Sequence, residues 1–469
     1  MDKTEKLTAR EGIEKLLDGA SFVELGRFFE QTAATPGYEC ATAPGEGVIT
    51  GYGSVLGRPV YVFAQDSAVL AGSMSRGQAE KIIKVLEMAE KNGSPVVGIL
   101  NSAGSRVSEG AAAMGAYNAL IKKLAELSGV VPTIAVAAGP CIGAAAVLPC
   151  VFDFTVAQEG SGILLHSPQV SAAHGKTQTK MSDAQLACSL GAAQFLAADE
   201  AAAFALVRKL LALLPQNNLE DPPAEAGGDP NRLIPEPDTR DSRELVKKIA
   251  DAGSFLEAYA AYGQSMITGF IRLNGYTAGI IANVGGTAPD ADACRKAARF
   301  ISLLDAYHLP ILTLADAGDI QPGVQDAGLP GPLSSLLYAY SQATAPMVTV
   351  VTGKVVGAGL LAMCPKSAGA DVVYAWKNAV LSALPPEAGA LIVYDAEIRN
   401  AADPVAARQE AIGKYTGTNA AAAEAARQGV VDDVIEPSAT RQMVIAAFEA
   451  CASKRLAAKP PKKHGVWPL

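Results

Sequence analysis

The sequence has little of what most metal-dependent and nucleophilic enzymes use. It contains no CxxC pair, and its few histidines are far apart, with no HExxH spacing. The histidines are His166, His174, His308 and His464. The cysteines are Cys40, Cys141, Cys150, Cys188, Cys294, Cys364 and Cys451. We therefore expect no metal site and no Ser-His-Asp chemistry, and we expect reduced thiols.

Positive charge and long apolar runs are scarce as well. Lys and Arg number 39 against 47 Asp and Glu, a net charge of −8, which argues against a nucleic-acid partner. The longest uncharged stretch, Gly129 to Phe152, is broken by three prolines, so we expect no transmembrane segment. The charged start MDKTEKLTARE has no apolar core, which predicts neither a signal nor a transit peptide and favours a cytoplasmic location.

Common nucleotide and hydrolase motifs are also absent. There is no GxxxxGK[ST], no GxSxG and no EF-hand spacing. Gly51, Gly53 and Gly57 formally match GxGxxG, but the following RPVYVF is typical of a strand. A dinucleotide fingerprint must open a helix at that point, so we interpret these glycines as part of a hairpin.

What the sequence does contain is a long internal repeat. The segment TAREGIEKLLDGASF from Thr8 resembles DSRELVKKIADAGSF from Asp241. In each, an N-cap residue stands three positions before a glutamate, which predicts a short helix. Next come two predicted hairpins, ITGYGSVLGRPVYVF from Ile49 and ITGFIRLNGYTAGIIAN from Ile267.

The repeat continues with a helix, a break and a buried strand in residues 79–104 and again in residues 293–318. It ends with VPTIAVAAGPCIGAAAVLP from Val131 and APMVTVVTGKVVGAGLLAM from Ala345, each a strand followed by a turn and a small-residue helix. Alternating strands and helices predict an α/β fold with mostly parallel sheets. A Pro/Gly/Asn-rich connector suggests two domains, residues 1–228 and 229–469, divided near Asp229.

The two strand-to-helix turns are the candidate site. They are Gly139-Pro-Cys-Ile-Gly143-Ala144-Ala145 and Gly353-Lys-Val-Val-Gly357-Ala358-Gly359. A helix N-terminus offers unpaired backbone N–H groups, and small residues let a ligand oxygen reach them, as an oxyanion hole requires. Close helix packing would also favour Gly and Ala, although two equivalent turns weaken that alternative.

Six segments carry a family resemblance. They are GVITGYGSVLGRPVYVFAQDSAVLAGSMSRGQAEKI, NSAGSRVSEG, AAGPCIGAAAVLP, LADAGDIQPGVQDAG, LLYAYSQATAPMVTVVTGKVVGAG and KKHGVWPL. Together they resemble the carboxyltransferase subunits of biotin-dependent acyl-CoA carboxylases and decarboxylases, such as propionyl-CoA carboxylase β chains and the α subunits of methylmalonyl-CoA and glutaconyl-CoA decarboxylases. The resemblance extends from Leu7 to Leu469.

The resemblance implies two tandem crotonase-like (ClpP/crotonase) ββα superhelical domains, the first on the acyl-CoA side and the second on the biotin side. It implies transfer of CO2 between carboxybiotin on a carrier protein and the α-carbon of a short acyl-CoA of the propionyl-CoA or acetyl-CoA type. Backbone amides of Gly143 and Ala144 would hold the thioester enolate, and those of Ala358 and Gly359 the biotin ureido oxygen. Ala103, Gly104, Gly357 and Leu361 would lie along the substrate. Leu361 could instead be helix core.

The resemblance also implies partners. The cofactors would be coenzyme A, as part of the substrate, and biotin on a separate biotin carboxyl carrier protein. A biotin carboxylase subunit or a membrane decarboxylase β subunit would complete the reaction. The family assembles as homo-oligomers, commonly hexamers built as trimers of dimers, whose active sites join the N-terminal half of one subunit to the C-terminal half of another.

Some positions depart from the family pattern. Ala103, Ala144 and Asp319 replace residues usual in the family, and the stretch from Ala184 to Phe195 replaces a histidine-containing one. Two further alternatives therefore stay open: a sodium-pumping decarboxylase α subunit that runs the reverse half-reaction, and a CoA-binding scaffold without turnover. A crotonase-type hydratase would need an acid such as Glu109, which we expect instead in a solvated loop or a salt bridge.

Overall fold

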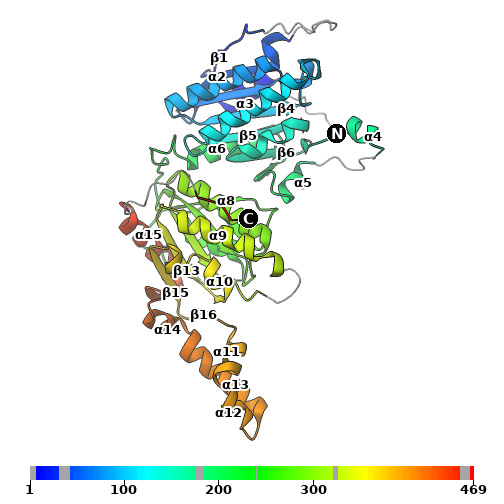
Figure 1. The fold of residues 1–469 in the computed structure, drawn as a ribbon. Helices are drawn as coiled ribbons and strands as arrows, with labels where there is room; N and C mark the ends of the chain where they lie inside the picture. Colours follow the sequence, from blue (N-terminus) through cyan, green and yellow to red (C-terminus); the bar gives the residue numbers. More distant parts are fainter. Residues whose placement is uncertain are drawn as a thin grey trace, which may run out of the picture. The chain divides into compact units, whose positions relative to one another are not determined.

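The computed structural model describes residues 7–30, 43–175, 183–235, 237–238, 240–320, 326–454 and 465–468. The chain divides into two compact units, Met1–Pro223 and Ala224–Leu469, coloured blue to green and green to red in Figure 1. Residues just after Pro223 pack in the second unit, where the Glu225 N–H donates to the Gly275 carbonyl at 3.1 Å. Cys40, Gln321 and His464 lie outside the described residues.

The first unit is built around one sheet, whose described strands run in the order β1-β2-β3-β4-β5-β6-β8, with β7 paired to β5. The strands are β1 (Val23–Leu25), β2 (Val48–Val55), β3 (Arg58–Gln65), β4 (Val96–Ser102), β5 (Thr133–Ile142), β6 (Phe154–Gln158), β7 (Gly162–Leu164) and β8 (Phe195–Ala197). From β3 onward all pairs are parallel, whereas β1, β2 and β3 are antiparallel.

The helices of this unit cover the sheet and supply its core. They are α1 (Ala9–Leu16), α2 (Arg76–Asn92), α3 (Ala111–Leu127), α4 (Pro168–Ala173), α5 (Ala184–Ser189) and α6 (Glu200–Leu213). The predicted capping box of Thr8 and Glu11 is present at the start of α1. Apolar side chains of α2 and α3 pack with those of β3, β4 and β5 in one buried cluster.

The second unit repeats this plan. Its described strands form a sheet in the order β17-β15-β13-β12-β11-β10-β9, beside a small β14-β16 pair. The strands are β9 (Leu256–Ala258), β10 (Met266–Leu273), β11 (Tyr276–Asn283), β12 (Ile311–Ala315), β13 (Met347–Val351), β14 (Lys354–Val356), β15 (Val372–Trp376), β16 (Val380–Ser382) and β17 (Asp433–Ile435). The main helices are α7 (Ser242–Ile249), α8 (Ala291–Ala306), α9 (Pro330–Gln342), α10 (Ala358–Ala362), α14 (Ala422–Arg427) and α15 (Thr440–Cys451).

A group of helices leads away from the sheet of the second unit. Figure 1 shows α11 (Pro386–Val393), α12 (Asp395–Arg399) and α13 (Pro404–Tyr415) extending in orange from the strand region. They share a small apolar cluster of their own that includes Ile398 and Tyr415. We call these three helices the arm.

The repeat predicted from the sequence is present in both units. Both hairpins turn through left-handed residue pairs, Leu56-Gly57 and Asn274-Gly275. In the first unit, the Asp18 carboxylate accepts the Gly57 N–H at 2.8 Å and pairs with Arg208 of α6 at 2.9 Å. In the second, the Asp251 carboxylate accepts the Gly275 N–H at 2.7 Å and pairs with Arg441 of α15 at 2.5 Å. We call each Asp–Arg–hairpin arrangement a clasp; it ties the last major helix of a unit to its first hairpin.

Candidate active site

The first candidate turn follows β5. Gly143 has φ +64°, a conformation that favours glycine, whereas Ala144 is not among the residues with positive φ. The expected small-residue helix takes the form of two short 3₁₀ helices, Gly143–Ala146 and Leu148–Val151. Pro149, in the first turn of the second piece, lacks the N–H that a continuous α-helix would use.

The structure brings Ala103 and Gly104 next to this turn. Gly104 has φ +107°, and a Cβ there would lie 2.8 Å from the carbonyl oxygen of Ile142, the residue before Gly143. The Gly104 carbonyl accepts the Met74 N–H at 2.8 Å, which fixes the loop from its other side. Ala103 is exposed beside it. Only glycine fits at position 104, whereas the alanine at 103 meets no such restriction.

A buried ionic cluster lies under this loop. Glu46 is 1% exposed, and its carboxylate accepts hydrogen bonds from Ser75 Oγ at 2.7 Å and from Arg106 Nη1 at 2.9 Å. The Arg106 guanidinium also contacts Glu109 at 3.5 Å, and Glu109 accepts the Arg76 N–H at 2.9 Å. Of the two settings expected for Glu109, the salt bridge is the one found. The sequence did not reveal Glu46 or Arg106, because their pairing spans 60 positions.

The second candidate turn follows β14. Gly357 has φ +53°, and its N–H donates to the Ser382 carbonyl at 3.0 Å. Ala358 and Gly359 then open α10, and among the described residues no acceptor is found for their N–H groups, as expected for the first turn of a helix. Leu361 is 57% exposed on α10, so it does not belong to the core of its own unit. Leu360 is the side chain of this helix that faces an internal apolar cavity.

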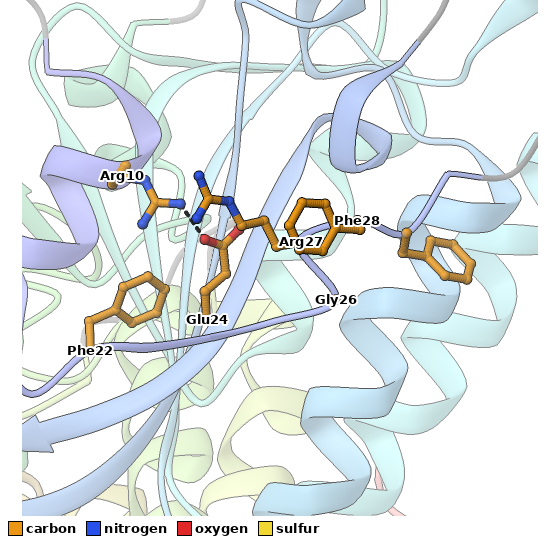
Figure 2. A pocket seen from close by; sticks show the side chains of 7 residues that line it. Arg10, Phe22, Glu24, Gly26, Arg27 and Phe28 are labelled. Atoms are coloured by element: carbon orange, nitrogen blue, oxygen red, sulfur yellow. Dashed lines mark hydrogen bonds and ion pairs between the residues drawn. The ribbon is translucent and has the colours of Figure 1, made fainter.

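A larger cavity lies at the edge of the first unit, beside β1. Figure 2 shows Arg10, Phe22, Glu24, Arg27 and Phe28 around it; its volume is about 570 Å³. The Arg10–Glu24 ion pair in this cavity has a counterpart in the second unit, Arg243–Glu257 at 2.7 Å. Because the pair recurs in both units, we attribute it to the shared fold and not to a ligand.

Two further properties bear on the chemistry. Among the residues that the structure describes, no group of His, Cys, Asp and Glu could hold a metal ion, and no cysteine forms a disulfide. No helix in the described ranges has the length and apolar character needed to cross a membrane. The two turns present backbone amides and small side chains.

Two sheet-based units, each with an antiparallel hairpin, a helix-to-strand unit and a strand that leads into a glycine turn, define an α/β protein of tandem crotonase-like domains. The family model for the carboxyl transferase domain matches residues 2–467. The chain belongs to the carboxyl transferase family, the enzymes that act as carboxyltransferases of biotin-dependent acyl-CoA carboxylases and decarboxylases.

Similar proteins cover nearly the whole chain. The methylmalonyl-CoA carboxyltransferase 12S subunit of Propionibacterium freudenreichii subsp. shermanii is 37% identical over 99% of this chain and 92% of its own. The methylmalonyl-CoA decarboxylase subunit alpha of Propionigenium modestum is 38% identical over 99% and 93%. The propionyl-CoA carboxylase carboxyltransferase subunit of Haloferax mediterranei is 39% identical over 99% and 94%.

A solved structure agrees with this assignment. The crystal structure of transcarboxylase 12S, a hexamer assembly with methylmalonyl-coenzyme A and methylmalonic acid bound, superposes with a TM-score of 0.94 at 36% identity. The match covers 99% of this chain and 92% of that one. The predicted fold class and family are confirmed.

Proposed function

We propose that this protein transfers CO2 between biotin on a separate carrier protein and the α-carbon of a short acyl-CoA, such as propionyl-CoA or acetyl-CoA. The observation that carries the proposal is the pair of equivalent glycine turns, one in each unit, each with a left-handed glycine followed by small residues. The binding of methylmalonyl-coenzyme A by transcarboxylase 12S supports a CoA ester as the substrate.

The first turn would hold the thioester. In this proposal the amides of Gly143 and Ala144 donate to the thioester oxygen and stabilise the negative charge that develops when the α-carbon loses its proton. Ala103 and Gly104 lie beside this turn, where Gly104 packs closely against the Ile142 carbonyl and Ala103 is exposed. Residues 1–228 would thus form the acyl-CoA side of the enzyme.

The second turn would hold biotin. The amides of Ala358 and Gly359 are neutral donors, which suit a ureido oxygen that gains negative charge. Bound biotin supplies the ureido nitrogen that carries and returns the carboxyl group. Residues 229–469 would form this side, with Gly357 shaping the turn and exposed Leu361 available to an acyl chain.

The opposite direction is a specific second candidate. Among the relatives are both carboxylase subunits and a decarboxylase alpha subunit, at nearly equal identity. In one case the partner would be a biotin carboxylase subunit, and in the other a membrane decarboxylase β subunit. A biotin carboxyl carrier protein would serve both, and we propose the cytoplasm as the location, in keeping with cysteines that form no disulfide in the described ranges.

We also propose a homo-oligomer, a hexamer like that of transcarboxylase 12S, in which the first unit of one subunit meets the second unit of another. The arm supports this proposal, because Leu391, Ile392 and Val393 of α11 are 38%, 68% and 57% exposed in the isolated chain. Consecutive exposed apolar side chains are typical of a protein interface.

The test is a mass-spectrometric assay of the purified protein with excess free biotin and, separately, malonyl-CoA, methylmalonyl-CoA and glutaconyl-CoA. Biotin-dependent formation of a decarboxylated thioester would establish the half-reaction and name the acyl group. Failure with all three esters, in a protein that is correctly assembled and still binds CoA esters, would contradict the proposed activity on this substrate class.

A further inference from the structure

Each unit places a polar side chain against a glycine on the approach to its turn. In the first unit, a Cβ on Gly139 would lie 2.2 Å from Asn101 Oδ1. In the second, a Cβ on Gly353 would lie 2.3 Å from Asp316 Oδ1. Such contacts leave no room for any residue but glycine, so the two polar side chains press directly on the backbone that leads to the turn.

A second contact shows that Asn101 and Asp316 are equivalent. The Asn101 N–H donates to Gln65 Oε1 at 3.2 Å, and the Asp316 N–H donates to Asn283 Oδ1 at 3.1 Å. Gln65 and Asn283 are the last residues of β3 and β11, and both are buried. An amide side chain from one strand thus anchors the end of the next strand in both units.

The units differ in the residue that follows the glycine. In the first, Gly139 precedes Pro140, which has no N–H and a fixed φ. There the neutral Asn101 side chain donates a hydrogen bond from Nδ2 to Ser67 Oγ at 3.0 Å. In the second, Gly353 precedes Lys354, whose N–H donates to Asp316 Oδ1 at 2.9 Å.

The Asp316 carboxylate is partly desolvated. Burial raises the pKa of this carboxyl above its usual value, while hydrogen bonds from the Lys354 and Gly286 N–H groups act in the opposite direction. A carboxylate is therefore found in the unit where a backbone N–H needs an acceptor, and a neutral amide in the unit where proline removes that N–H.

The Lys354 segment is connected to the second turn through the loop after Asp316. The Lys354 carbonyl accepts the Gly318 N–H at 2.9 Å, which brings the loop after Asp316 alongside β14. In that loop, the Ala317 methyl group lies 3.0 Å from where a Cβ of Gly359 would be. A shift of the Lys354 segment would thus be transmitted to the amides at the start of α10.

From these contacts we infer that Asp316 is a positioning residue for the second turn. Its carboxylate holds the backbone of Lys354 in the conformation that aims the amides of Ala358 and Gly359, the task that Pro140 performs by its ring in the first unit. The inference rests on the proposed function for its consequence, since that function assigns biotin to the second turn.

The kinetic test uses the full-length protein, free biotin and whichever of the three CoA esters the wild type decarboxylates. D316A should lower kcat/KM for biotin about tenfold, the effect of losing one hydrogen bond to a charged group, with the KM for the CoA ester within about twofold of wild type. D316N, whose amide oxygen still accepts the Lys354 N–H, should keep most of the activity. N101A, the matched change in the first unit, should leave the KM values for biotin and for the CoA ester within about twofold of wild type, because Pro140 fixes that segment by its ring.

A structural readout keeps the test independent of activity. In hydrogen exchange followed by mass spectrometry, D316A should speed exchange in peptides spanning residues 353–363 and leave those spanning residues 139–147 unchanged. The double variant D316N/K354P copies the Asn and Gly-Pro of the first unit and should restore slow exchange in residues 355–363.

Unchanged exchange in D316A would overturn the inference even if the wild type has no activity on these esters. Equal losses for biotin and for the CoA ester, in a correctly assembled D316A, would overturn it too, because they would indicate a general structural role. If the wild type is inactive but D316A still exchanges faster, the positioning role of Asp316 is supported. The same result would count against the proposed function.

Discussion

Asp18 offers a test at the scale of one side chain. Hydrogen bonds, first of all from the Gly57 N–H, lower the pKa of its carboxyl to about 2 from the ordinary 3.8, and Arg208 contributes in the same direction. Because the folded-state pKa is the lower one, the carboxylate stabilises the fold above pH 3.8, and this contribution is lost as the pH falls toward 2.

We therefore expect D18N to lose about 1 kcal/mol at neutral pH, after allowance for solvent screening of a partly exposed group. The difference from wild type should shrink on acidification to about pH 2.5, which thermal unfolding at both pH values would measure. A difference that is constant with pH would mean that the clasp works through packing and not through charge.

At Gly359, donation by the backbone N–H can be tested separately from the lack of a side chain. G359P removes the backbone N–H at a position in the first turn of a helix, where proline is otherwise tolerated, and should lower turnover by roughly 10²-fold. G359A is the matched control, because it adds a Cβ near Ala317 but keeps the N–H. Equal activities of the two variants would show that the Gly359 N–H is not a donor in the proposed oxyanion hole.

The corresponding variant of the first turn, G143P, is expected to lower turnover as strongly. Gly143 has φ +64°, however, and proline requires about −65°, so part of its effect would come from the backbone. Gly359 is therefore the sharper position at which to measure the loss of a donor.

Leu361 is exposed, so its replacement should leave the unit folded. L361F should change the ratio of kcat/KM between acetyl-CoA and propionyl-CoA type esters by roughly tenfold, as expected when a pocket loses room for one methylene. Light scattering would check the assembly. An unaltered ratio would exclude Leu361 from the acyl pocket.

At the scale of elements, α2 and α8 each carry a buried lysine that binds carbonyl oxygens. Lys81 Nζ donates to the Gly45 and Val48 carbonyls at 2.8 and 2.7 Å. Lys296 Nζ donates to the Tyr262 and Met266 carbonyls at 2.7 and 2.6 Å. Each lysine thus fixes the loop that leads into the hairpin of its unit.

K296M should destabilise the second unit by roughly 2–4 kcal/mol, because buried carbonyls lose their donor. K247M, a change at an exposed lysine of α7, should stay within about 0.5 kcal/mol of wild type in the same denaturation experiment. Burial lowers the pKa of Lys296 to about 8, so in wild type the stability should rise from about pH 8 toward 10.5, and K296M should lack this rise.

Local sequence rules predict the helices, hairpins and strands of both units. Capping residues, the glycine hairpins and the helix-to-strand units all appear where their periodicity and turn residues predict them. Sequence similarity aligns Ala79 with Ala293, whereas the structure shifts the match by one residue: Lys81 corresponds to Lys296, and the left-handed Gly93 to the left-handed His308. Sequence similarity alone does not reveal this shift, because the correspondence of the two helices is defined by their contacts in the folded units.

The two turns of the candidate site can be predicted from the sequence, but the contacts that support them cannot. Its turns stand out because two glycine-rich segments repeat, and the left-handed conformations of Gly143 and Gly357 agree with that signal. The contacts near them, the Glu46–Arg106 ion pair and the hydrogen bond from the Lys354 N–H to Asp316, join residues far apart in the sequence. No local rule distinguishes such residues from surface charges until the strands are paired.

At the scale of the whole molecule, assembly is expected to depend on the arm. I392D should abolish the oligomer and, with it, activity, while each unit keeps its circular dichroism spectrum, since this side chain is 68% exposed and not needed for the fold. L219D, a change at a leucine that is 91% exposed in the first unit, is the control. If light scattering gives I392D the same mass as wild type, the arm is not part of the oligomer interface.

The two clasps also have a consequence for synthesis on the ribosome. Asp18 and its hairpin emerge early, but Arg208 follows 190 residues later, and the same separation recurs between Asp251 and Arg441. We expect the first unit to complete its fold only after α6 has left the exit tunnel, and the second only near the end of translation. A nascent chain that stalls between these points would present an open hairpin edge to chaperones, whereas one that stalls after α6 has left the tunnel would carry a finished first unit.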